Sequence, residues 1–84
     1  MEDKLKKFRS QIDGLDLMIM GLIEQRMEVS KEVGKYKKEK NIQVNNSNRE
    51  LEIITKMQQF KNRDQIKAVY DTIFIQSKKI QEEL

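Results

Sequence analysis

The sequence has no cysteine and no histidine among its 84 residues. Without these side chains we expect no disulfide, no thiol nucleophile, no imidazole general base and no metal site of the common zinc type. The absence of proline and the presence of only three glycines suit an all-helical protein. No apolar run approaches a membrane span and no signal-peptide pattern opens the chain, so we expect a cytoplasmic protein without a membrane partner.

Charge is abundant but mixed in sign along the chain. Seventeen Lys and Arg residues oppose 14 Asp and Glu residues, for a net charge of +3. This balance mildly favours anionic partners, but a nucleic-acid footprint is usually a clustered basic patch. We therefore expect a small anionic ligand and no nucleic-acid partner.

One stretch, residues 5–36, has an apolar residue at alternating steps of three and four. These seam residues are Leu5, Phe8, Ile12, Leu15, Ile19, Leu22, Val29, Val33 and Tyr36. Heptad spacing predicts a helix, at about 4–39, that packs along its length against other helices. Such a helix is roughly 53 Å long, which exceeds the diameter of a compact domain of this size. The geometry therefore predicts an intertwined homodimer.

The remaining chain predicts two shorter helices, which makes the fold all-α with a three-helix protomer. After a polar loop at 41–46, Ser47 as N-cap and Glu50 as its partner fit a capping box for a helix at about 48–60. Asp64 is the expected N-cap of a third helix at about 65–83. We treat residues 1–84 as one domain.

A few polar residues fall where the helical pattern expects apolar ones. Arg26 interrupts the seam, and Lys37, eleven residues later, returns to within about 20° of it. Two interpretations stay open: both cations extend to water, or they line an anion pocket. Ser77 and Gln81 lie on the apolar face of the third helix, unless its last turns fray. Glu50 lies at the edge of the inward face, where the capping box is the simpler role.

Five short stretches, in this order and spacing, are similar to those of one enzyme family. They are FRSQID at 8–13, EQR at 24–26, VGKYK at 33–37, NRE at 48–50 and SKKIQ at 77–81. With them, the chain resembles the all-helical class of chorismate mutases from Leu5 to Gln81. The resemblance implies a domain-swapped dimer with two active sites. It also implies a Claisen rearrangement of chorismate to prephenate, in aromatic amino acid biosynthesis, without a cofactor.

The resemblance assigns four residues to the reacting part of the substrate. Arg26 would hold a carboxylate, Lys37 would contact a carboxylate and the ether oxygen, and Gln81 would contact the same oxygen. Arg9 would reach into the pocket of the partner chain. This agrees with helix geometry, because Arg9 and Arg26 are roughly 25 Å and about 100° apart on one helix.

Four further residues would complete the site by the same resemblance. Glu50 would accept the substrate hydroxyl, Ser77 would help to bind a carboxylate, and Arg49 would support the site. Asn46 stands where relatives often have Asp. If the backbone of Asn46 makes the contact with the substrate, this difference is mild. If a carboxylate is needed at this position, binding of the substrate hydroxyl is affected.

Two alternatives remain open from the sequence. An isochorismate pyruvate-lyase has a related all-helical fold, and product analysis separates the two enzymes. A non-enzymatic basic helical module would bind nucleic acid or a partner helix, and would place its cations along an exposed face and not on the seam.

Overall fold

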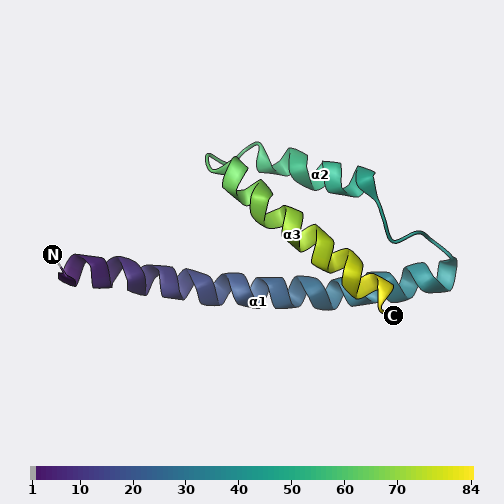
Figure 1. Ribbon diagram of the computed structural model, residues 1–84, viewed down its shortest axis with the longest axis horizontal. Coiled ribbons are helices and arrows are strands. Elements are labelled where there is room, and N and C mark those ends of the chain that lie inside the picture. The colour runs from purple at the N-terminus through teal and green to yellow at the C-terminus, as the bar shows by residue number, and fades with distance from the viewer. Residues whose placement is uncertain (1) are drawn as a thin grey trace.

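The computed structural model describes residues 2–84, which form three α-helices and no strand within that range. Helix α1 spans Glu2–Lys40, α2 spans Ser47–Met57 and α3 spans Arg63–Glu82. The prediction of an all-α, three-helix chain is confirmed. Figure 1 shows α1 as one long rod, with α2 and α3 folded back over the half of α1 that carries its C-terminal end. None of these helices combines the length and apolar character needed to cross a membrane.

The molecule is elongated because α1 runs through its whole length. Its extents are 58 × 25 × 14 Å and its radius of gyration is 16.5 Å. A compact domain of this size would have a radius of gyration of about 12 Å. The 39 residues of α1 account for the longest extent at the usual rise per residue.

Helix α1 ends in a Schellman motif. Asn41 has a positive φ of 56°, which asparagine tolerates better than most residues. The Ile42 N–H donates to the carbonyl of Lys37 at 2.8 Å, and the Asn41 N–H donates to that of Lys38 at 3.4 Å. These bonds satisfy carbonyls that the helix end would leave free, and they turn the chain back towards α2.

Helix α2 begins one residue earlier than expected, and the predicted capping box is wrong. The N-cap is Asn46, whose side-chain oxygen accepts a hydrogen bond from the Arg49 N–H at 3.0 Å. Asparagine caps as well as serine does, so Asn46 takes the role expected of Ser47. The helix also ends earlier, at Met57, because the next residues form turns with bonds such as Phe60 N–H to the Met57 carbonyl.

Helix α3 also begins before its predicted cap. Asn62 occupies the N-cap position without a side-chain hydrogen bond, and Asp64 lies inside the first turn. A carboxylate is favourable there because it faces the positive end of the helix dipole. Asp64 therefore stabilises the start of α3 without capping it.

Few side chains are buried in this chain. Helix α3 packs against both α1 and α2, while α1 and α2 do not pack against each other over the described residues. The buried apolar residues are Met57, Ile73 and Phe74, joined by the buried hydroxyls of Ser30 and Ser77. The six seam residues from Leu5 to Leu22 are 48–61% exposed. The first half of α1 therefore has little cover from its own chain.

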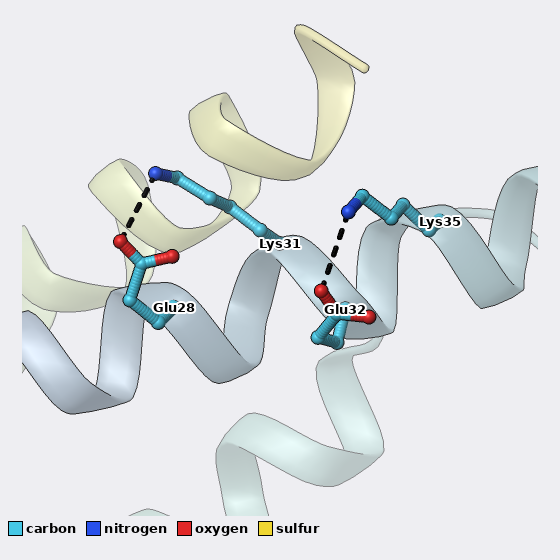
Figure 2. A network of polar contacts seen from close by, with 4 residues as sticks. All are labelled: Glu28, Lys31, Glu32 and Lys35. Carbon is cyan, nitrogen blue, oxygen red and sulfur yellow. Dashed lines mark hydrogen bonds and ion pairs between the residues drawn. The ribbon is translucent and has the colours of Figure 1, made fainter.

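Local ion pairs stabilise the exposed side of α1. Figure 2 shows Lys31 paired with Glu28 and Lys35 paired with Glu32, each at 3.3 Å. Both pairs join residues one helical turn apart. Exposed pairs of this kind contribute only a few tenths of a kcal/mol each. These charges support the helix and keep its outer face solvated.

Candidate active site

A cavity of about 260 Å³ lies between α1, the loop that follows it, the start of α2 and α3. It exists because α2 packs against α3 but stands away from α1. Its walls include every predicted site residue except Arg9, namely Arg26, Lys37, Asn46, Arg49, Glu50, Ser77 and Gln81. These predicted residues supply three cationic side chains, one carboxylate and several neutral hydrogen-bonding groups to one small space.

The seam arginine is held at this cavity by an aromatic ring. Arg26 is half-buried, and its guanidinium carbon lies 5.8 Å from the centroid of the Tyr70 ring. Tyr70 in turn packs edge-on against Phe74, with centroids 5.8 Å apart. A cation over an aromatic face is stabilised without losing all of its hydrogen-bonding capacity. Arg26 therefore lines the cavity as a held cation with donors left for an anion.

Lys37 lies at the other end of the same stripe of α1. Its ammonium donates to the carbonyl oxygen of Val44 at 3.1 Å, and both residues line the cavity. The Schellman motif at the end of α1 brings the loop within reach of this lysine. A backbone carbonyl takes only one of the three N–H donors of an ammonium. The remaining donors are free for a ligand in the cavity.

A buried chain of polar groups joins α1 to α3 beside these cations. The hydroxyls of Ser30 and Ser77 lie 2.7 Å apart, and the Gln81 Nε2 donates to the Ser77 Oγ at 3.4 Å. The two serines are 6% and 8% exposed. The Gln81 Oε1 is buried and has no partner among the described residues. Gln81 is thus packed at the cavity, which excludes a frayed, solvated end at this position.

Gly34 allows α3 to approach α1 at the level of Gln81. A Cβ atom at Gly34 would lie 2.9 Å from the Gln81 Cα and 2.7 Å from the Leu84 Cδ1. Both contacts are too short for ordinary side chains, and the first is with backbone. A Cβ atom at Gly14 or Gly21, which lie earlier on α1, would have nothing within 4 Å in this chain. Helical spacing alone gives no signal for such a close approach.

Helix α2 contributes residues from its first turn. Asn46 uses its side-chain oxygen as the N-cap, so its side chain is already engaged in starting the helix. Arg49 lines the cavity, and its Nη1 contacts the Glu52 Oε2 at 3.1 Å on the exposed side of α2. Neither residue is buried.

Glu50 has a different partner from the one predicted. Its carboxylate pairs with the Lys78 ammonium on α3 at 2.9 Å and does not turn back to a capping box. Lys78 lines the cavity, and the sequence reasoning did not name it as a site residue. A signal was present, because Phe74, Ser77, Lys78 and Gln81 follow the i, i+3, i+4, i+7 spacing of one helix face.

Arg9 is the one predicted site residue that this chain does not bring to the cavity. It is exposed on the first half of α1. It lies seventeen residues before Arg26 on the same helix, which corresponds to about 25 Å. A single chain therefore offers it no route to the other site residues.

Fold and site together define an all-helical protein with a cation-rich cavity suited to a small organic anion. A family model described as Chorismate mutase type II matches residues 8–82. The chain therefore belongs to the chorismate mutase type II family, and the family resemblance found in the sequence is confirmed. No curated protein and no solved structure matches the chain.

Proposed function

We propose that this protein is a chorismate mutase that converts chorismate to prephenate. The observation that carries the proposal is the single cavity that gathers Arg26, Lys37, Glu50 and Gln81 in a chain of this family. Chorismate is a dicarboxylate with a hydroxyl and an ether oxygen. The cavity offers cations for the carboxylates, a carboxylate for the hydroxyl and an amide for the ether oxygen.

The reaction suits a site without a nucleophile or a tuned general base. One C–O bond breaks and one C–C bond forms within the same molecule, so no proton or electron needs to be transferred. Negative charge grows on the ether oxygen in the transition state, and a fixed ammonium such as that of Lys37 stabilises it. Cations on both carboxylates also favour the compact reactive conformer.

Gln81 supplies the second contact to the ether oxygen in this proposal. Its Oε1 is buried without a partner among the described residues, while its Nε2 donates to Ser77. Turning the amide over would let Oε1 accept from the Ser77 hydroxyl and would direct Nε2 into the cavity. A bound ether oxygen would then accept from Nε2, and both ends of the amide would have a partner.

The difference at Asn46 is mild in this account. Its side chain caps α2, and Asn and Asp are about equally good caps. The substrate hydroxyl is assigned to Glu50, whose carboxylate already lines the cavity. Hydroxyl binding therefore does not depend on a carboxylate at position 46.

The working form in this proposal is a homodimer in which α1 of one chain covers α1 of the other. The seam residues from Leu5 to Leu22 are 48–61% exposed in one chain, and burying them supplies the stabilisation that the small core lacks. The same pairing would carry Arg9 of each chain towards the cavity of its partner, where it adds a further cation. Exchange of this half of α1 is the domain swap.

Incubation with chorismate, followed by identification of the product, tests the function. We expect prephenate from the wild-type protein. Lys37→Met should lower turnover by about 10²–10³-fold, as loss of a donor to a developing oxyanion does. Lys35→Met is the matched control, because Lys35 is exposed and pairs with Glu32 on the surface of α1. Pyruvate released from isochorismate, without prephenate from chorismate, would contradict the proposal and favour the lyase.

A further inference from the structure

The ion pair between Lys78 and Glu50 differs from the others in the described part of the chain. The other four pairs join residues three or four apart on one helix, as the two in Figure 2 do. The Lys78 Nζ and the Glu50 Oε2 lie 2.9 Å apart and join α3 to α2. This pair therefore ties together two walls of the cavity.

The pair is also better shielded from water than the local pairs. The side chains of Lys78 and Glu50 are 34% and 27% exposed, whereas those of the other pairs are 43–72% exposed. Partial burial weakens screening by water and salt, so the attraction is stronger than that of a surface pair. The geometry of Glu50 is accordingly fixed more firmly than that of an exposed glutamate.

A free carboxylate in this cavity would compete with the substrate. Arg26, Lys37 and Arg49 line the same small space as Glu50, and each would attract an anionic side chain. A Glu50 side chain that moved onto one of them would occupy a donor meant for a substrate carboxylate. A fourth cation, placed on α3, keeps the carboxylate on the α2–α3 side.

We propose that Lys78 is a positioning residue for the substrate-hydroxyl acceptor. Its ammonium holds the Glu50 carboxylate on the α2–α3 side of the cavity, with one oxygen directed at the hydroxyl, and keeps it away from Arg26 and Lys37. Lys78 then acts on the reaction through Glu50 and does not contact the reacting atoms. This inference rests on the proposed mutase function.

A double-mutant cycle on the full chain tests the inference. Lys78→Met should lower kcat/KM by about three- to tenfold, the range for a partly shielded ion pair, with most of the loss in KM. Lys78→Arg should restore the wild-type value. Lys79→Met removes the same charge from the adjacent, exposed position and should change little. In a Glu50→Ala background, Lys78→Met should have no further effect, because no carboxylate remains to be held.

Three results would overturn the inference. The first is an equal loss with and without Glu50, which would mean that Lys78 contacts substrate directly. The second is a loss of the same size in Lys79→Met, which would mean that only net charge matters. The third is an unchanged KM in Lys78→Met. If Lys78→Met unfolds at a lower temperature than wild type, Lys78→Gln replaces it as the variant without the charge. Where a variant turns over too slowly for kinetics, its affinity for prephenate, measured by calorimetry, takes the place of kcat/KM in the cycle.

The wild-type assay separates this inference from the function on which it rests. A wild-type protein that makes no prephenate overturns the proposed function and the role of Lys78 with it. If the wild-type protein makes prephenate but the losses caused by Lys78→Met and Glu50→Ala simply add in the double mutant, the proposed function stands and only the role of Lys78 is overturned.

Discussion

The two halves of α1 share one heptad pattern but have opposite surroundings. In the first half, the six seam residues from Leu5 to Leu22 are 48–61% exposed, and Figure 1 shows the N-terminal end of α1 extending beyond α2 and α3. In the second half, Ser30 and Gly34 are buried against α3, and Arg26 and Lys37 line the cavity. One continuous helix thus carries an uncovered apolar face and a polar site.

The comparison shows that a heptad seam predicts that a helix packs against other helices. The seam does not say whether those helices belong to the same chain or to another. Arg26 marks the change, because it interrupts the apolar series at the point where the cavity begins. In the second half, α3 of the same chain covers the face that carries Ser30 and Gly34, while the seam residues Val29 and Tyr36 are 62% and 57% exposed. In our proposal the first half is covered by a second copy and carries Arg9 to the partner's cavity, while the second half supplies Arg26 and Lys37 to the cavity of its own chain.

The largest expected effect comes from placing a charge in the uncovered half. Leu15→Asp puts a carboxylate on the seam, where a dimer would bury it without a partner at a cost of several kcal/mol. We expect a protein that sediments as a monomer, unfolds readily and has no mutase activity. Sedimentation velocity and the chorismate assay measure both effects.

Leu17→Asp is the matched control for the seam. Leu17 is 73% exposed and lies about 200° around the helix from Leu15, so its charge should remain in water. We expect a folded, active dimer. If Leu15→Asp behaved like Leu17→Asp, the first half of α1 would not be an interface and the two halves would not differ as proposed.

A smaller effect, confined to the catalytic half, is expected for Gln81→Glu. A carboxylate beside the ether oxygen repels the charge that grows there, so turnover near neutral pH should fall by about 10²-fold. Protonation at acidic pH restores a donor, and part of the activity should return. The wild-type amide does not titrate, so its rate should vary little between mildly acidic and mildly basic pH.

Rate–pH profiles of both proteins, with folding checked by circular dichroism at each pH, make this comparison. A Gln81→Glu variant whose profile matches that of wild type would remove Gln81 from the reacting centre. The contacts assigned to α3 would then need revision, while the assembly half of the comparison would stand.

The smallest effect is expected where α3 crosses α1 most closely. In Gly34→Ala the new methyl group meets the Gln81 backbone at 2.9 Å, and the forced shift should cost about 1–3 kcal/mol, partly offset by about 1 kcal/mol of better helix propensity. Urea unfolding should show a net loss of stability, with a severalfold lower turnover because Gln81 moves. No loss of stability would contradict the close packing.

Gly14→Ala extends this test to the uncovered half. Nothing lies within 4 Å of a Cβ at Gly14 in one chain, so better helix propensity should stabilise the protein by about 1 kcal/mol. A loss of stability there would show that the backbone of a partner approaches this glycine. That result would sharpen the account by locating the closest point of the dimer interface.

The sequence predicted the helices and most of the cavity because both follow helical periodicity. Arg26, Lys37, Ser77 and Gln81 were found as polar residues on apolar faces, and all four line the cavity. The predicted capping box of Ser47 and Glu50 was wrong, because a cap shifts by one residue at almost no energetic cost when asparagine precedes serine.

Other features depend on which residue of another helix a side chain meets, and the spacing within one helix does not specify that partner. Lys78 was missed because a lysine on an amphipathic helix is ordinarily solvent-facing, and only the position of Glu50 on α2 gives it a partner. The close approach at Gly34 likewise depends on where α3 crosses α1. Periodicity also does not specify what packs against the first half of α1, because in our proposal that partner is a second chain.

Subunit complementation tests the central claim, a cavity completed by a second copy, most directly. Arg9→Ala and Arg26→Ala should each be inactive as homodimers. After mixing in equal amounts, with exchange verified by native mass spectrometry, a heterodimer keeps one site with both arginines intact. Statistical exchange then predicts recovery of about a quarter of the wild-type activity, as expected for an isologous dimer. No recovery despite demonstrated heterodimers would show that Arg9 and Arg26 do not serve one site from two chains.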